Sequence, residues 1–427
     1  MKIVYVMETM SIRGGLERIM SEKINYFADN LGYDITLLEV YSFRKEIKGR
    51  GDNSESRDAY RISEKVNRVR LGIQKIRLKP LKIFTFLKVA KMVANEIDRL
   101  RPDIMISASL IGVIVFSLKK YPCRTIFESH QNRGTMPLQF LMKRMERNVD
   151  CVVTLTQGDA KEYVLAKKVY VIPNFNTVYP LSPDYRHQRT KEVVALGRLC
   201  KEKGYDFLLE AWSKINTYLP DYRLCIYGDG KERNALLSLI SKLKISDSVS
   251  LLPSSGDVYS IYRSADLLLL TSHCEGLPLV LLEAMAYGVP VVTVDIPFGP
   301  RDILSEKLPE SEYSTDDFQE VPLIDFSNLQ RITELDFSNP SVLLSKDFKK
   351  LSSFMSSPLT VCKGGILVER DVLSFANAVL KILKNNQLYS ALSSSAPSVS
   401  NRYSKDSIIP RWCSLFSDVM KLKRSSC

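Results

Sequence analysis

The feature that most constrains the fold is a strand, a short loop and a helix that follow one another between Ala265 and Pro290. Ala265 to Leu270 has the length and apolar character of a fully buried strand. The segment after Pro278 is apolar over the length of a helix and ends at Gly288 and Pro290. Strands and helices alternate in this way along most of the chain, which predicts an α/β protein with doubly wound parallel sheets.

Two carboxylates and a row of backbone amides give this stretch its chemistry. Glu283 is the single charged residue between 277 and 286, so it needs an internal Arg or Lys, or a ligand hydroxyl, as its partner. Glu275 lies eight positions earlier, in the loop. The start of a helix presents free N–H groups that suit a phosphate. The amides in question belong to Gly276, Leu277, Leu279 and Val280.

Three other turns lie at the carboxyl ends of predicted strands. Gly14 and Gly15 follow the first strand, at the position where a ligand approaches the backbone in an open parallel sheet, although a plain turn would also use glycine. Arg198 and Lys203 follow the strand that begins at Glu192, and two fixed cations there would neutralise a diphosphate. Gly228 ends a further strand.

The string E-G-L-P-L-V-L-L-E-A-M-A-Y-G-V-P-V-V, from Glu275 onward, resembles the E-x7-E signature of the retaining glycosyltransferases of family 4. That resemblance implies the GT-B fold, in which two Rossmann-like domains face a central cleft. It also implies transfer of a sugar from a nucleotide diphosphate, a UDP- or GDP-sugar, to an acceptor hydroxyl with retained anomeric configuration. No further cofactor is expected.

The resemblance also assigns roles in the second domain. Glu275 would contact the hydroxyls of the donor sugar at the reacting end, and Glu283 the ribose. Arg198 and Lys203 match the pattern G-R-L-x-x-x-K-G, whose Arg and Lys hold the donor pyrophosphate. Gly228 matches a G-D-G turn near the nucleotide base.

In the first domain, the resemblance places Gly14 and Gly15 opposite the donor. His130, in F-E-S-H-Q-N, would lie on the acceptor side, although a lone histidine is often a structural residue. Electrostatic stabilisation of the leaving phosphate would then carry most of the rate, and no metal site is expected, because the sequence offers neither a suitable D-x-D pair nor a His/Cys cluster.

The length of 427 residues favours two domains. We predict an acceptor-side domain at 1–175, a linker at 176–190 and a donor-binding domain at 191–402. An insertion at about 305–360 separates the signature from the segment G-G-I-L-V, and residues 403–427 form a helix that can cross back to the first domain.

The net charge of +12 lies entirely in the first half, with a concentration from Arg61 to Arg101. That stretch could lie on an anionic membrane or be a solvated face. Scattered cysteines and the absence of a signal-peptide core predict a cytoplasmic protein with at most a peripheral contact at the inner face of the membrane. The resemblance implies a glycan or polyprenyl-linked acceptor and a part in surface polysaccharide synthesis. The alternatives are a nucleotide-sugar epimerase, or a non-catalytic basic scaffold for lipid or nucleic acid, although no nucleic acid is expected.

Overall fold

The chain forms two α/β units, each organised around a seven-stranded sheet. The computed structural model describes residues 1–12, 14–41, 58–73, 82–180, 189–312 and 359–422. The first unit comprises Met1–Thr177 and Ser404–Cys427, and the second comprises Val178–Tyr403. The division at Thr177 falls inside the predicted linker at 176–190, of which residues 181–188 lie outside the described residues.

All strands of the first sheet are parallel, in the order β3-β2-β1-β4-β5-β6-β7. The strands are β1 (Lys2–Met7), β2 (Asp34–Tyr41), β3 (Asn67–Ile73), β4 (Ile104–Ala108), β5 (Arg124–Glu128), β6 (Cys151–Thr154) and β7 (Val169–Val171). Most of their residues are buried on both faces, as expected for a sheet that helices cover on two sides.

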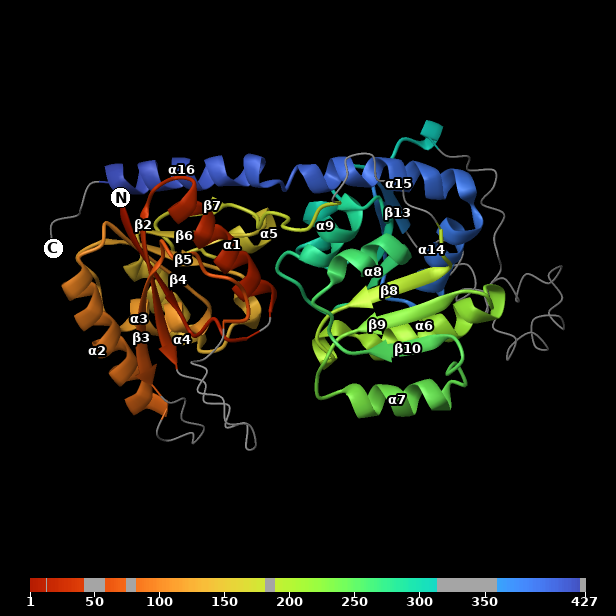
Figure 1. Ribbon diagram of the computed structural model, residues 1–427, viewed down its shortest axis with the longest axis horizontal. Helices are drawn as coiled ribbons and strands as arrows, with labels where there is room; N and C mark the ends of the chain where they lie inside the picture. Colours follow the sequence, from red (N-terminus) through yellow and green to blue (C-terminus); the bar gives the residue numbers. More distant parts are fainter. Residues whose placement is uncertain (13, 42–57, 74–81, 181–188, 313–358, 423–427) are drawn as a thin grey trace, which may run out of the picture. The chain divides into compact units, whose positions relative to one another are not determined.

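Helices cover both faces of this sheet (Figure 1). They are α1 (Gly15–Asp29), α2 (Lys82–Leu100), α3 (Ser109–Leu118), α4 (Gln139–Asn148), the short α5 (Gln157–Ala160) and α16 (Lys405–Lys421). The helices α1 and α16 pack on one face, where Trp412 and Phe416 of α16 contact Phe27 of α1. The helices α2, α3 and α4 pack on the other face. The last helix of the chain therefore completes the core of the first unit.

The second sheet has the order β10-β9-β8-β11-β12-β14-β13 and is parallel except for β13. Its strands are β8 (Glu192–Leu196), β9 (Arg223–Tyr227), β10 (Val249–Leu252), β11 (Ala265–Leu270), β12 (Val291–Val294), β13 (Leu359–Cys362) and β14 (Gly365–Val368). Its helices are α6 (Tyr205–Tyr218), α7 (Arg233–Lys242), α8 (Val258–Ser264), α9 (Leu279–Ala286), α10 (Pro300–Ile303), α14 (Val372–Lys384) and α15 (Asn386–Asn401). The helices α6, α7 and α14 share one core with the sheet.

Both edge strands β3 and β13 were missing from the sequence analysis. In β3, Arg68 and Arg70 alternate with apolar residues and pair with Glu39 of the neighbouring strand β2, whereas the sequence analysis treated them only as part of the basic stretch from Arg61 to Arg101. The strand β13 lies at the end of the predicted insertion at about 305–360. Most of that insertion, residues 313–358, lies outside the described residues.

Candidate functional site

The predicted donor-binding loops of the second unit follow two adjacent strands, β8 and β11. The strand order reverses between these two strands, because β9 lies beside β8 and β12 lies beside β11. In open α/β sheets this switch point is where loops diverge and ligands bind. The fold therefore brings the loop that carries Arg198 and Lys203 to the same edge of the sheet as the loop that carries Glu275.

The two loops are joined by a charged contact between predicted site residues. The Lys203 ammonium lies 2.6 Å from Glu275 Oε1, and the Ser272 hydroxyl donates to the same oxygen at 2.6 Å. Three further bonds connect the loops: the Thr271 hydroxyl donates to the carbonyls of Lys203 and Gly204, each at 3.1 Å, and the His273 amide donates to the Glu202 carbonyl at 2.8 Å. Cation and anion are thus held together at the end of the sheet.

Arg198 lies in an exposed position in the β8 loop. Among the residues that the structure describes, its guanidinium takes part in no ion pair. Because no ion pair or hydrogen bond occupies it among the described residues, the Arg198 guanidinium retains its donors for an anionic ligand.

Backbone packing leaves no room for a side chain at Gly228. A Cβ atom there would lie 1.9 Å from the carbonyl oxygen of Gly197, and one at Gly230 would lie 2.2 Å from the carbonyl oxygen of Leu199. The G-D-G turn and the β8 loop therefore pack backbone against backbone, and the Leu199 amide donates to the Asp229 carbonyl at 2.9 Å. The role of Gly228 beside a nucleotide base stays a prediction.

The helix α9 begins at Leu279, with Pro278 as its N-cap. Gly276 and Leu277 precede it, and Leu279 and Val280 form its first turn, so their amides lie at the positive end of the helix. Gly299 supports this turn with a φ of +82°, and a Cβ there would lie 2.9 Å from the Gly276 carbonyl oxygen.

Glu283 lies inside the unit, with 1% of its surface exposed. Its Oε2 accepts a hydrogen bond of 2.6 Å from the Tyr262 hydroxyl on α8. The sequence analysis expected an Arg, a Lys or a ligand hydroxyl as the partner, and the Tyr262 hydroxyl is one donor to this carboxylate. A contact of Glu283 with the ribose stays a prediction, and it requires the carboxylate to become accessible.

The sequence analysis missed Arg370, which follows β14. Its guanidinium donates to the carbonyls of Thr271 and Ser272 at 2.8 and 3.3 Å, lies 3.0 Å from His273 Nε2, and stacks on Phe207 with 4.8 Å between the guanidinium carbon and the ring centroid. Arg370 therefore fixes the loop that carries Glu275. Little in the sequence indicates this role, because Arg370 lies nearly one hundred residues from the loop it contacts and belongs to no recognisable motif.

His130 belongs to the first unit, in the loop after β5. Its Nε2 lies 2.9 Å from Glu128 Oε1, and the same oxygen forms an ion pair with the ammonium of Lys23 on α1. Burial raises the pKa of the Glu128 carboxyl, but the Lys23 ammonium and His130 outweigh burial and lower that pKa to about 2. Neither Lys23 nor Glu128 was a candidate from the sequence.

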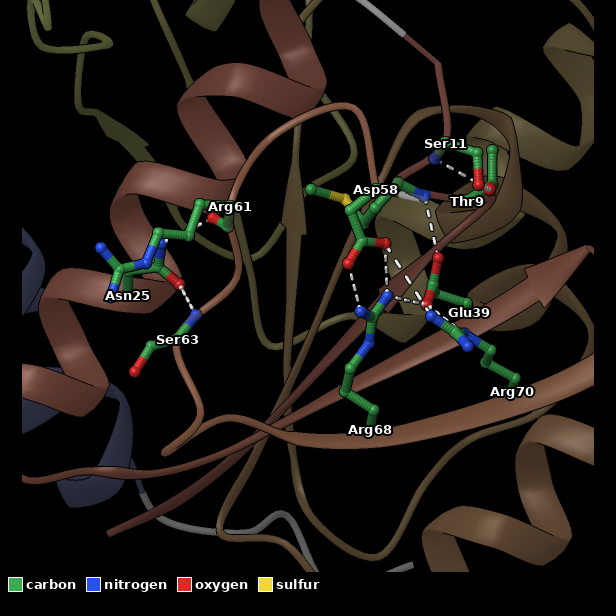
Figure 2. Close-up of polar contacts among 10 residues, drawn as sticks. Thr9, Ser11, Asn25, Glu39, Asp58, Arg61, Ser63, Arg68 and Arg70 are labelled. Atoms are coloured by element: carbon green, nitrogen blue, oxygen red, sulfur yellow. Dashed lines mark hydrogen bonds and ion pairs between the residues drawn. The ribbon is translucent and has the colours of Figure 1, made fainter. Parts of the chain in front are cut away.

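The loop that ends in Gly14 and Gly15 is anchored at its start by a buried carboxylate (Figure 2). Glu39 accepts from the Met10 amide at 2.9 Å, and from Arg68 and Arg70 at 2.5 and 3.1 Å. Gly14 is the N-cap of α1, and a Cβ atom at Gly15 would have nothing within 4 Å. The fold therefore does not require glycine at position 15.

The basic stretch from Arg61 to Arg101 is partly neutralised within the unit. Arg68 pairs with Glu39 and Asp58, and Arg99 pairs with Glu96. Lys88 and Lys91 of α2 are exposed, whereas residues 74–81 lie outside the described residues. In the part of the chain that the structure describes, no helix has the length and apolarity needed to span a bilayer.

A family described as "Glycosyl transferases group 1" matches residues 181–310. The chain is 27% identical to an uncharacterized glycosyltransferase of Haemophilus influenzae, with 72% of this chain and 84% of that relative covered. It is 28% identical to the amylovoran biosynthesis glycosyltransferase AmsD of Erwinia amylovora, with 71% and 84% covered.

Among solved structures, HepE of Anabaena in complex with UDP and glucose has a TM-score of 0.64 at 15% identity, with 98% of this chain and 99% of that chain covered. This likeness confirms the GT-B fold that the sequence predicted. The matching family and the relatives support a glycosyltransferase. Membership of family 4 and the function of the E-x7-E carboxylates stay predictions.

Proposed function

We propose that this glycosyltransferase moves a sugar from a nucleotide diphosphate to a glycan or polyprenyl-linked acceptor, with retention of the anomeric configuration. The contact between Lys203 and Glu275 carries the proposal, because it places a cation for the diphosphate directly beside an acceptor for the sugar hydroxyls. The name of the relative AmsD favours polysaccharide synthesis, and the UDP and glucose bound to HepE favour a UDP-sugar as donor.

In this proposal, negative charge that develops on the leaving diphosphate is stabilised by Arg198, Lys203 and the amides at the start of α9. The binding of a diphosphate draws Lys203 toward the phosphate oxygens and frees Glu275 Oε1 for a hydroxyl of the sugar. The Ser272 hydroxyl and the Arg370 guanidinium keep the Glu275 loop in place during this exchange. In the complex, Lys203 therefore contacts the diphosphate and Glu275 contacts the sugar, in place of their contact with each other.

The first experiment is a thermal-shift panel of UDP- and GDP-sugars, because a ligand that binds the folded state raises Tm. The donor that stabilises the protein is then incubated with a candidate acceptor, and the anomeric configuration of the product is read by NMR. Glu275→Gln should abolish transfer while Tm stays within a few degrees of the wild-type value. An inverted product would contradict retention, and appreciable turnover by Glu275→Gln would contradict the role of that carboxylate.

Controls separate the two rival functions. An epimerase would convert the donor sugar without any acceptor, so that donor alone should stay unchanged. A basic scaffold would bind lipid or nucleic acid with a steep salt dependence and would be insensitive to Glu275→Gln.

A polyprenyl-linked acceptor would bring the first unit to an anionic membrane, for which the chain offers two exposed helical surfaces. On α2, Leu87 lies beside Lys88 and Lys91. On α4, Phe140 is 76% exposed and shares one face with Lys143, Arg144 and Arg147, at the helical spacing i, i+3, i+4 and i+7. Aromatic and basic residues on one helical face suit the interface of an anionic bilayer.

Sedimentation with vesicles containing phosphatidylglycerol tests this surface. The double variants Lys88→Glu/Lys91→Glu and Lys143→Glu/Arg144→Glu reverse the charge of one helix each. The helix that docks is the one whose variant loses binding. Equal binding by both variants and the wild type would contradict membrane docking through these helices. It would not bear on the proposed transfer reaction.

A further inference from the structure

Three ionisable side chains form a buried chain in the first unit. Lys23 on α1 and Glu128 at the end of β5 are each 1% exposed, and the side chain of His130 is 7% exposed. Glu128 Oε1 contacts both the Lys23 ammonium and His130 Nε2. Its other oxygen, Oε2, is buried and has no hydrogen-bond partner among the described residues. The hydrogen bonding of this carboxylate is therefore concentrated on the oxygen that faces His130.

The Lys23 ammonium is held in place by aromatic rings as well as by Glu128. It lies 4.1 Å from the ring centroid of Trp412 on α16 and 5.8 Å from that of Tyr5 on β1. Cation–π contacts are strongest where water is excluded. The last helix of the chain thus closes over the cation that neutralises Glu128.

The charge state of Glu128 determines which nitrogen of His130 carries a proton. Its pKa of about 2 means that Glu128 is a carboxylate at neutral pH and can only accept hydrogen bonds. The bond at 2.9 Å therefore requires a proton on His130 Nε2. In a neutral ring the lone pair then lies on Nδ1, which accepts no hydrogen bond from the described residues.

Lys23 supplies the Glu128 carboxylate with a countercharge other than His130, and burial lowers the pKa of the Lys23 ammonium while the contact with Glu128 opposes that shift. With the ammonium present, the buried carboxylate already has one full countercharge. Without it, the carboxylate would favour a second proton on the ring, because a buried charge that lacks a partner is costly. Of the other titratable groups near this loop, Asp159 accepts from Ser129 and from the Arg133 amide, and Tyr163 donates to Ser129. The Tyr5 hydroxyl on β1 is buried and has no hydrogen-bond partner among the described residues; burial and the Glu128 carboxylate raise its pKa, so it stays neutral.

We infer that Lys23 and Glu128 are positioning residues that hold His130 as the neutral Nε2–H tautomer, with Nδ1 presented as an acceptor to a ligand hydroxyl. The inference rests on the proposed function for the part that His130 plays in transfer. The protonation state itself can be measured without any activity.

The test is side-chain ¹⁵N NMR of the full chain, which contains only three histidines, His130, His187 and His273. The signal of His130 is assigned from its loss in His130→Gln. The wild type should show the Nε2–H tautomer at pH 8. A Nδ1–H tautomer, or a ring that is still doubly protonated at pH 8, would overturn the inference without any need for a variant.

Two variants then test the pair. In Lys23→Met, the titration of His130 should move to higher pH by about one unit or more, because the carboxylate has lost its countercharge. In Glu128→Gln, it should move to lower pH, and kcat/KM should fall about 10- to 100-fold, as is typical when a supporting partner is lost. A titration that does not move in either variant would contradict the inference.

Lys405→Met is the matched control. Like Lys23, Lys405 forms an ion pair and an aromatic contact: its ammonium lies 2.7 Å from Glu22 and 5.6 Å from the ring centroid of Phe175. No contact between Lys405 and Glu128 is present among the described residues. Its removal should leave the titration of His130 unchanged. Should Lys23→Met fail to fold, Trp412→Phe weakens the hold on Lys23 and should move the titration in the same direction by a smaller amount. If the tautomer is as expected but His130→Ala still transfers sugar, the proposed part of His130 in the reaction fails and the positioning inference stands.

Discussion

Replacement of Lys203 by methionine tests the central contact of the second unit. Methionine keeps most of the length and apolar surface of the side chain and removes only the charge. Glu275 then retains the Ser272 hydroxyl as a donor but loses the ammonium at 2.6 Å. The variant should therefore lose both part of the folding free energy and most of the binding of the leaving diphosphate.

The two losses differ in size. The side chains of Lys203 and Glu275 are 21% and 12% exposed, which lies between a solvent-exposed pair and a buried one. We expect a loss of about 1–2 kcal/mol in the free energy of unfolding, between the values typical of those two classes. Removal of one group that stabilises developing charge costs about 2–4 kcal/mol, which corresponds to a roughly 30- to 1,000-fold fall in kcat/KM.

Lys201→Met provides the comparison. Lys201 lies in the same short 3-10 helix, and its side chain is exposed. Because the Lys201 charge is exposed and screened by salt, and Lys203 is the residue paired with Glu275, removal of Lys201 should change kcat/KM by less than about threefold. Initial rates over a range of donor concentrations and urea unfolding curves measure the two quantities separately. If Lys203→Met and Lys201→Met had the same kcat/KM, the assignment of Lys203 to the diphosphate would be refuted.

Four further outcomes are expected. Gly15→Ala should leave Tm unchanged or slightly raised, because a Cβ there meets open space in the first turn of α1. If the donor approaches this turn, kcat/KM should fall about 10- to 100-fold. An unchanged kcat/KM would show that Gly15 does not belong to the donor site. Gly228→Ala should cost about 2–3 kcal/mol in urea unfolding, because its Cβ would lie 1.9 Å from a carbonyl oxygen, whereas Gly256→Ala, with nothing within 4 Å, should change stability by less than about 0.5 kcal/mol. Incubation with EDTA should leave transfer unchanged, and a clear loss would show that the metal-free expectation is wrong. Because the pKa of Glu128 is lowered to about 2, its contribution to stability is complete above about pH 4.5 and is lost as the pH falls toward 2; Glu128→Gln should flatten the wild-type loss of stability in that window, as followed by circular dichroism.

Much of the fold could be predicted from the sequence, because buried parallel strands are continuous apolar runs and the turns after them are rich in glycine. The edge strand β3 could not be predicted in this way. Its arginines at positions 68 and 70 are partnered by Glu39 of the neighbouring strand, and that partnership exists only once the sheet has formed. Part of the stretch that reads as a basic, solvated face in the sequence is thus an edge strand whose arginines are paired.

The same limit applies to the site. Lys203 and Glu275 could be predicted because each lies in a motif of its own loop. Arg370 and Tyr262, by contrast, come from separate elements and reach their partners through the fold, as Lys23 and Trp412 reach Glu128 in the first unit. Nothing in the local sequence around these side chains distinguishes them from ordinary surface or core residues.

The return of α16 to the first unit sets an order of events during synthesis. Ile408, Trp412 and Phe416 fill the same core as Ile3 and Phe27, although some four hundred positions separate them along the chain. When the ribosome has translated the seven strands of the first unit, it has not yet synthesised α16, which helps to cover one face of their sheet. The second unit can therefore fold before α16 is complete. The core around Lys23 excludes water fully only after Trp412 of α16 has been synthesised and packed against it.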